Sequence, residues 1–247
     1  MPGQPLTRAP GTAVISGAGR GFGAALAAVL AAEGWAVFGI VRPGAVAVTA
    51  TAATCTGHGS VRFLEWDIAH PCPEDVAEVL AGATIDVVVN NAAIGSSQKT
   101  LREVDANALV QLLDNNIVGA VRVTRACLPG LHRAGESGRR PVVVNVSSRL
   151  GSAALQAGGD FAGFGTSYGY RLSKAALNML TLSLHEEFGA EMDAWSVHPG
   201  ALTTGMGRAG ASKEPATAAR ELLRELTGGR GTSPRYFELG ASVPLPW

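Results

Sequence analysis

Tyr170 and Lys174, in the stretch "SYGYRLSK", are the residues whose types and spacing most directly suggest chemistry. Residues four apart on a helix lie on one face, whereas residues six apart do not, so Lys174 pairs with Tyr170 rather than with Tyr168. An ammonium group near a phenol favours the phenolate, which would let a tyrosine with an ordinary pKa of about 10 exchange protons at neutral pH. An ordinary surface helix could carry the same short pattern, so further residues are needed to decide.

A glycine-rich turn, "SGAGRGFG", follows the first apolar run of the chain. Glycines at such a turn let the backbone approach a pyrophosphate, which then lies at the positive N-terminus of the next helix. Gly17, Gly21 and Gly23 give the spacing GxxxGxG rather than GxGxxG, although Gly19 also supplies a GxG. Placed between a strand and a helix, this turn predicts a dinucleotide site.

The end of the second predicted strand indicates which dinucleotide is used. Enzymes that use NAD usually place Asp or Glu there, whereas an arginine accommodates the 2′-phosphate of NADP. No acid occurs between Glu33 and Glu65, while Arg42 directly follows the strand and Arg20 lies in the glycine turn. Two guanidinium groups without a competing carboxylate favour NADP, the alternative being that Arg42 is a solvated loop residue.

Six apolar, β-branched runs must form the elements that position these residues. They are continuous rather than alternating, as in a parallel sheet covered on both faces. The predicted strands are 12–16, 35–41, 61–66, 85–90, 141–148 and 194–198. The segments with helical character that follow them are 22–33, 73–80, 106–131, 170–188 and 216–226. We therefore expect an α/β fold with a single domain over 1–247, a doubly wound parallel sheet (Rossmann fold) with helices on both faces, after a flexible N-terminus at 1–10.

The composition of the chain indicates which partners it is expected to bind and in which cellular compartment it is expected to lie. The 247 residues suffice for one large α/β domain, and the formal net charge of zero predicts neither a nucleic-acid nor a membrane partner. Three cysteines cannot form a disulfide framework and no apolar signal core is present, so we expect a cytoplasmic protein. Cys55, His58, His70 and Cys72 do not match a zinc spacing, so no metal site is expected.

Taken together, the motifs resemble those of the short-chain dehydrogenase/reductase family over nearly the whole chain. Besides the glycine turn and YxxxK, the family's order is followed by "EWDI", "NNAA", "NNIVG", "NVSS" and "HPGALTT". Within the family, "SSRLGS", "YGYRLSKAALNM" and the terminal "PLPW" are most similar to the bacterial C-factor and sniffer-type carbonyl reductases. The resemblance implies a catalytic tetrad of Asn116, Ser148, Tyr170 and Lys174. The adjacent Asn115 and Ser147 are the plausible misassignments.

The resemblance also implies the residues that contact the cofactor. These are Gly17, Gly19, Arg20, Gly21, Phe22, Gly23, Arg42, Asp67, Ile68, Asn91, Ala92, Ala93, Tyr170, Lys174, Pro199, Gly200, Leu202 and Thr204. The chain departs from the family at Ala93, where NNAG reads "NNAA", and at Gly205, where an acid is common. The stretch between Ser148 and Tyr170 is also longer than the most common form. These departures affect the expected substrate rather than the expected chemistry.

The activity implied by the resemblance is NADPH-dependent reduction of a ketone or aldehyde, with Tyr170 as the general acid. Ser148 would orient the carbonyl oxygen, and Lys174 would lower the pKa of Tyr170 and bind the nicotinamide ribose. Asn116 would hold a water in the proton path. Two alternatives stay open: the same site running as an NADP-linked alcohol dehydrogenase in biosynthesis, and a non-catalytic NADP-binding regulatory or signalling protein.

Three further expectations concern the surroundings of the site. Apolar residues available there suggest a small apolar carbonyl substrate, although they could equally be packing residues: Leu150, Leu155, Phe161, Phe164 and Met206. Segment 205–219 is predicted to be a substrate lid hinged near Gly205 and Gly210, the alternative being an ordinary surface loop. A homodimer or homotetramer is expected through helices 106–131 and 170–188, unless the lengthened segment before Tyr170 covers that surface.

Overall fold

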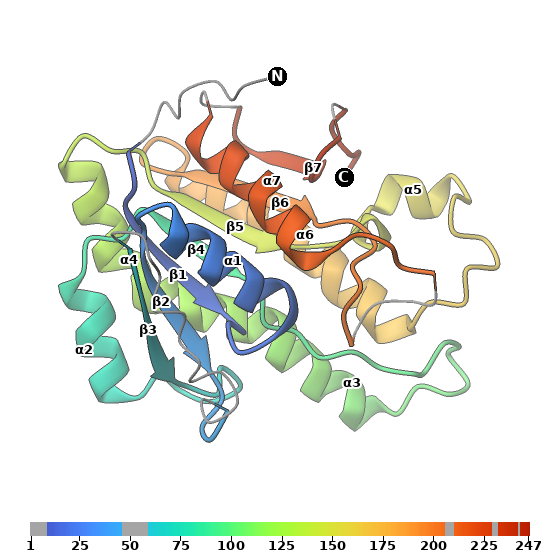
Figure 1. Cartoon of the computed structure of the whole chain (residues 1–247). Coiled ribbons are helices and arrows are strands. Elements are labelled where there is room, and N and C mark those ends of the chain that lie inside the picture. The colour runs from blue at the N-terminus through green and yellow to red at the C-terminus, as the bar shows by residue number, and fades with distance from the viewer. Residues whose placement is uncertain (1–8, 46–58, 206–209, 229–231, 242) are drawn as a thin grey trace.

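The computed structural model describes the chain except for residues 1–8, 46–58, 206–209, 229–231 and 242. Within the described residues, seven strands form one sheet in the order β3-β2-β1-β4-β5-β6-β7, and every neighbouring pair is parallel (Figure 1). The strands are β1 (Thr12–Ser16), β2 (Ala36–Val41), β3 (Ser60–Glu65), β4 (Val87–Asn90), β5 (Val142–Val146), β6 (Asp193–His198) and β7 (Arg235–Glu238). The doubly wound parallel sheet expected from the sequence is thus confirmed.

The strand order reverses between β1 and β4, because β1 lies beside both β2 and β4. In open α/β sheets, ligands bind outside the carboxyl ends of the strands at such a switch point. The six strands predicted from apolar runs are all present. The sequence "RYFE" of β7 was not predicted, because its two apolar residues are flanked by charged ones and give no continuous apolar run.

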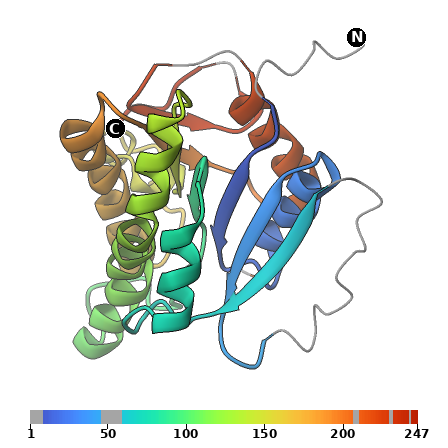
Figure 2. The same cartoon turned by 90° about the vertical axis from the view of Figure 1, so that its left-hand side faces the viewer.

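Helices cover both faces of the sheet (Figure 2). One face carries α1 (Gly21–Ala32) and α7 (Pro215–Thr227), and the other carries α2 (Glu74–Gly82), α4 (Gly119–Glu136) and α6 (Tyr168–Phe188). Two further helices, α3 (Ala106–Leu113) and α5 (Ala153–Ala157), lie toward the carboxyl ends of the strands (Figure 1). Each face of the sheet therefore buries its own apolar layer.

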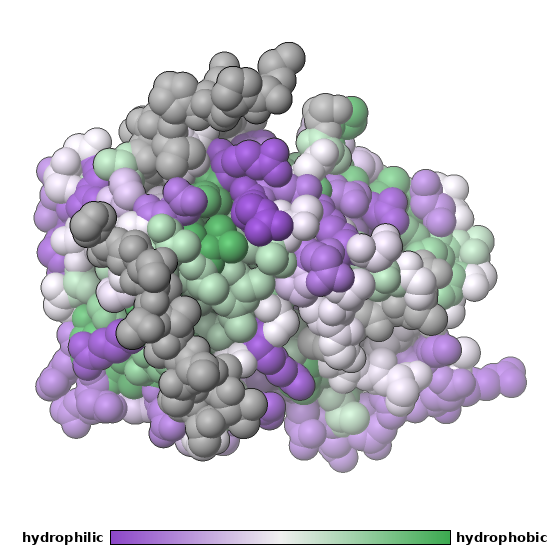
Figure 3. Space-filling model, in the orientation of Figure 1, coloured by the Kyte–Doolittle hydropathy of each residue, from purple (hydrophilic) through white to green (hydrophobic). Residues whose placement is uncertain are grey.

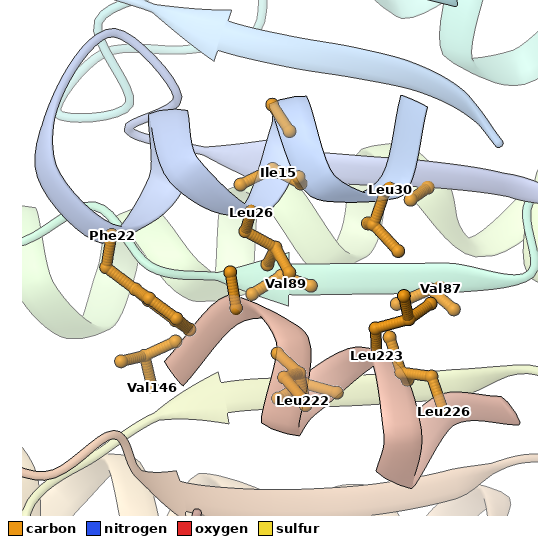
Figure 4. Packing of buried hydrophobic residues seen from close by; sticks show 14 of the residues in the cluster. Ile15, Phe22, Leu26, Leu30, Val87, Val89, Val146, Leu222, Leu223 and Leu226 are labelled. Carbon is orange, nitrogen blue, oxygen red and sulfur yellow. The ribbon is translucent and has the colours of Figure 1, made fainter. Parts of the chain in front are cut away.

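The layer between α1, α7 and the sheet is drawn in Figure 4. Leu26 of α1 and Leu222 of α7 are fully buried in this layer, and Leu26 lies beside Val89 of β4 (Figure 4). Burying a leucine side chain contributes about 1.5–3 kcal/mol, so this layer fixes α1 and the glycine turn before it against the sheet. Phe22, the residue after Gly21, belongs to the same layer and faces Val146 (Figure 4).

The helix predicted over 106–131 is interrupted. Between α3 and α4, residues Asp114–Val118 form a π-helical turn that contains Asn116. Such turns add one residue to the hydrogen-bonded ring and occur frequently at functional sites. Apolar periodicity does not reveal them, because the residues on both sides remain helical.

The surface, the helices and the side-chain clusters add three observations. Polar and apolar residues are interspersed on the face seen in Figure 3. No helix among the described residues is long and apolar enough to cross a membrane. Within the same part of the chain, no three His, Cys, Asp or Glu side chains lie close enough together to hold a metal ion. Cys55 and His58 lie outside the described residues.

Candidate active site

The predicted tyrosine and lysine lie side by side in the first turns of α6. Ser167 caps this helix, with its Oγ accepting a hydrogen bond from the Tyr170 amide at 3.3 Å. The Lys174 Nζ lies 5.5 Å from the centre of the Tyr170 ring and donates to the Val146 carbonyl oxygen at 2.7 Å. Tyr168 points elsewhere, and its ring lies 5.8 Å from the guanidinium carbon of Arg171. The structure therefore brings Tyr170, not Tyr168, to the lysine.

Burial sets the protonation of both groups. Lys174 is only 4% exposed, and desolvation lowers its pKa to about 8. Burial raises the pKa of Tyr170, and a side-chain hydrogen bond with Ser148 only partly opposes this rise. The lysine was expected to lower this pKa, but loss of water around the phenol dominates, and the pKa lies above its ordinary value. Tyr170 is therefore a neutral phenol at neutral pH, which is the form that can give up a proton.

The structure also separates the two serines after β5. Ser148 is the one that hydrogen-bonds to Tyr170, and its Oγ accepts a bond from the Leu150 amide at 3.3 Å. Ser147 is equally buried, but its Oγ donates to Asn178 Oδ1 at 2.6 Å. The adjacent serine thus ties β5 to α6, while Ser148 faces the tyrosine.

Asn116 is 3% exposed, and its side-chain amide makes three hydrogen bonds. Its Oδ1 accepts from the Ile94 amide at 2.8 Å, and its Nδ2 donates to the Ile94 carbonyl at 3.0 Å and to Ser173 Oγ at 3.2 Å. These bonds join the π-helical turn, the loop after β4 and α6. The side chain therefore fixes the loop that borders the site, and the role of Asn116 in holding a water stays a prediction.

The glycine turn has the backbone shape that its sequence predicts. Gly17 and Gly21 have φ angles of +69° and +57°, which side chains rarely tolerate. A Cβ atom on Gly23 would lie 2.4 Å from the Gly17 carbonyl oxygen, so α1 can approach the turn only with glycine there. Asn91, expected to contact the cofactor, uses its Nδ2 to donate to the carbonyls of Ser16 and Gly17 and so braces the turn.

The N-terminus of α1 is open to an anion. Its N-cap residue, Arg20, makes no capping hydrogen bond, and the first turn of the helix contains no acid. Unpaired backbone N–H groups at a helix N-terminus attract phosphate groups. Thr204 lies beside this turn, because a Cβ atom on Gly21 would be 3.5 Å from its Cγ2. A diphosphate would thus lie between the glycine turn and the segment after β6.

Arg42, which was predicted to bind the 2′-phosphate of the cofactor, directly follows β2. Arg42 and Asp67 line one shallow depression together with Gly44. Arg20 and Arg42 are exposed, and no described carboxylate forms an ion pair with either. Glu65 of β3 is nevertheless close, because its carboxylate accepts a bond from the Gly44 amide at 3.2 Å. The sequence has no acid along β2 itself, and Glu65 reaches the loop after β2 only because β3 pairs with β2.

The remaining predicted contact residues lie along the same edge of the sheet, with different exposure. Phe22 and Ile68 are about 95% buried and Leu202 is 8% exposed, so these three serve mainly as packing residues. Ala92, Ala93 and Pro199 are half-buried, and Gly200 has a φ angle of +94°. Ala92, Ala93 and Pro199 are therefore more accessible to a ligand along this edge than Phe22, Ile68 and Leu202 are.

The segment predicted to be a lid divides into parts. Residues 206–209, with Met206, lie outside the described residues. Beyond them, Lys213 pairs with the chain after β6, its amide donating to the Ala201 carbonyl and its carbonyl accepting from the Thr203 amide. Residues 215–219 of the predicted lid belong to α7, where Ala218 is fully buried. A movable segment here would have to end before Lys213.

Comparisons with known proteins agree with this arrangement. The family model described as short chain dehydrogenase matches residues 11–215. C-signal of Myxococcus xanthus is 36% identical over 165 residues, which cover 66% of this chain and 93% of that protein. Two solved structures are similar as well: the carbonyl reductase Sniffer of D. melanogaster and a short chain dehydrogenase from Burkholderia cenocepacia in complex with NADP.

The two structures differ in how closely they match. Sniffer has a TM-score of 0.81 and 25% identity, with 96% of this chain and 99% of that chain covered. The Burkholderia protein has a TM-score of 0.71 and 26% identity, with 95% and 90% covered. The family expected from the motifs is confirmed, and the chain belongs to the short-chain dehydrogenase family.

Proposed function

We propose that this protein reduces the carbonyl group of a ketone or aldehyde with NADPH. The observation that carries this proposal is the meeting of the buried Ser148 and Lys174 with the half-buried Tyr170, beside Val146 at the carboxyl end of β5. Similarity to a carbonyl reductase and to a protein solved with NADP supports it.

The residues present fit a dinucleotide with a 2′-phosphate. The open N-terminus of α1 and the glycine turn would hold the diphosphate, and Arg20 and Arg42 would meet the 2′-phosphate. Lys174 and Tyr170 lie across the edge of the sheet from this turn, where the nicotinamide ribose would come. When bound, NADPH supplies the hydride that reduces the carbonyl carbon.

Side chains of the protein would supply the proton that the carbonyl oxygen takes up. Tyr170, a neutral phenol, donates its proton to the carbonyl oxygen, and Ser148 donates a hydrogen bond to the same oxygen and so orients it. The phenolate left behind is stabilised by Lys174, which keeps its proton at neutral pH because its pKa is about 8. The cation therefore favours the phenolate once the proton has been transferred, although burial keeps the pKa of Tyr170 above its ordinary value.

The test is Tyr170→Phe, assayed by NADPH consumption with a panel of aldehydes, ketones and quinones. We expect kcat to fall by about 10²–10⁴-fold, the contribution of a positioned general acid, while the Kd for NADPH stays nearly constant. Tyr168→Phe is the matched control, because Tyr168 lies two residues away and its ring packs on Arg171 instead. Full turnover by Tyr170→Phe would exclude this mechanism.

A second candidate is a non-catalytic signalling protein, and one observation favours it: a relative 36% identical over 165 residues is named C-signal. The complete set of Asn116, Ser148, Tyr170 and Lys174 argues against lost catalysis. Absence of NADPH consumption with every carbonyl compound in the panel, together with tight NADPH binding, would favour this candidate. Faster NADP reduction with alcohols would instead favour the alcohol dehydrogenase direction.

A further inference from the structure

A residue of strand β7 forms a hydrogen bond with the backbone of Ser148, the serine that hydrogen-bonds to Tyr170. The hydroxyl of Tyr236, on β7, donates to the Ser148 carbonyl oxygen at 2.5 Å. The Gly151 amide donates to the same oxygen at 2.8 Å. Two donors thus hold the peptide group of Ser148 at the point where the chain leaves β5. The direction of a side chain follows its backbone, so these bonds also aim the Ser148 Oγ.

The Tyr236 hydroxyl stays protonated and can therefore always donate this hydrogen bond. Its side chain is 2% exposed, and burial raises its pKa to about 12, so the hydroxyl keeps its proton throughout the ordinary pH range. A side-chain hydrogen bond also links Tyr236 to Asn178, whose Oδ1 accepts from Ser147. Tyr236 therefore joins a buried polar network behind both serines, and such networks rigidify the groups they connect.

The last five residues, 243–247, hold Tyr236 in this place. The Trp247 ring packs on the Tyr236 ring with a centroid distance of 5.2 Å and an interplanar angle of 33°. The Leu245 amide donates to the Tyr236 carbonyl at 2.8 Å. The Trp247 carbonyl in turn accepts from the Ala154 amide, at the start of α5, at 2.9 Å. This segment therefore joins β7 to the stretch between Ser148 and Tyr170.

We infer that Tyr236 is a positioning residue for Ser148, and that Trp247 holds both Tyr236 and the start of α5 in the geometry that this requires. The inference rests on the proposed function, because it assigns Ser148 its role in carbonyl reduction. Neither residue touches the reacting atoms. Both act through the backbone of residues 148–154.

The kinetic test is Tyr236→Phe, which removes one hydroxyl and keeps the ring. We expect kcat to fall by about tenfold while the NADPH Kd is unchanged, because one of two hydrogen bonds on the Ser148 carbonyl is lost. In a Ser148→Ala background the same change should have no further effect, since Tyr236 acts through Ser148. Tyr168→Phe controls for loss of a tyrosine hydroxyl. An equal fall in both backgrounds, or none in either, overturns the inference.

A second measurement does not depend on activity. The amides of Leu150, Gly151 and Ala154 bond to Ser148 or to Trp247. Tyr236→Phe and Trp247→Ala should each speed hydrogen exchange of these amides by about tenfold, while exchange in β4 stays unchanged. Unchanged exchange at 149–154 overturns the inference whatever the activity. If the wild type oxidises no NADPH but exchange is faster in both variants than in the wild type, the proposed function alone is refuted.

Discussion

Lys174→Met separates the role of the lysine in catalysis from its effect on stability. Burial lowers the lysine pKa from 10.5 to about 8, which corresponds to a cost of about 3 kcal/mol for keeping the ammonium inside the folded protein. Its hydrogen bond to the Val146 carbonyl, at 2.7 Å, returns about 1.5–3 kcal/mol. The two contributions nearly cancel. We therefore expect the free energy of unfolding at neutral pH to change by no more than about 1–2 kcal/mol in the variant, which keeps the length of the side chain.

Activity should respond very differently. The phenolate of Tyr170 would lose the neighbouring Lys174 ammonium, whose Nζ lies 5.5 Å from the centre of the Tyr170 ring. We expect kcat to fall by about 10²–10⁴-fold, as for loss of a group that supports general acid catalysis. NADPH consumption measures this fall, and far-UV circular dichroism shows whether the variant is folded.

The pH dependence of stability gives a sharper test of the buried charge. Below a pH of about 8, the folded and unfolded chains both hold the Lys174 proton, and the cost of burial is fully present. Between about 8 and 10.5 the unfolded chain holds this proton more tightly, so the stability of the wild type rises with pH. Relative to Lys174→Met, which has nothing to titrate here, the gain should approach about 3 kcal/mol.

Urea unfolding of both proteins at a series of pH values across this window measures the difference. All other titrating groups are shared, so they cancel in the comparison. A difference between wild type and variant that stays constant from neutral pH to the top of the window would refute the reasoning, because it would mean that the ammonium is not desolvated.

Three further predictions concern the cofactor, the packing and the assembly. The wild type should prefer NADPH over NADH by about tenfold or more in kcat/KM, and Val41→Asp with Arg42→Ala should move the preference toward NADH; equal values for the wild type would contradict this. Gly151→Ala should lower the free energy of unfolding by about 1–3 kcal/mol in urea titrations, because its Cβ would lie 2.6 Å from a backbone carbonyl of α6; an unchanged value would contradict it. Light scattering should show a homo-oligomer through the exposed Val118 and Met179, and Met179→Glu should weaken it; a wild-type mass near 25.2 kDa would exclude it.

Much of the fold and part of the site could be predicted from the sequence, because both depend on local patterns. Continuous apolar, β-branched runs that alternate with helical segments favour buried strands of a parallel sheet. Parallel strands bring all their carboxyl ends to one edge, so the motifs that follow them had to meet there. The pairing of Tyr170 with Lys174 rather than with its neighbour follows from the helical repeat alone. The glycine-rich turn after the first strand could likewise be predicted, and glycine permits the positive φ angles that Gly17 and Gly21 adopt there.

Other features were decided only by the tertiary structure, since they depend on contacts between distant residues. The pKa of Tyr170 is raised rather than lowered, because burial is the sum of everything packed around the phenol. Glu65, on the neighbouring strand, accepts a hydrogen bond from the loop after β2. The side-chain amide of Asn116 forms a hydrogen bond with the backbone of Ile94. Tyr236 meets Ser148 across 88 positions of sequence. Residue spacing predicts which side chains share a face of one element, whereas such long-range contacts exist only once the sheet has brought its separate strands together.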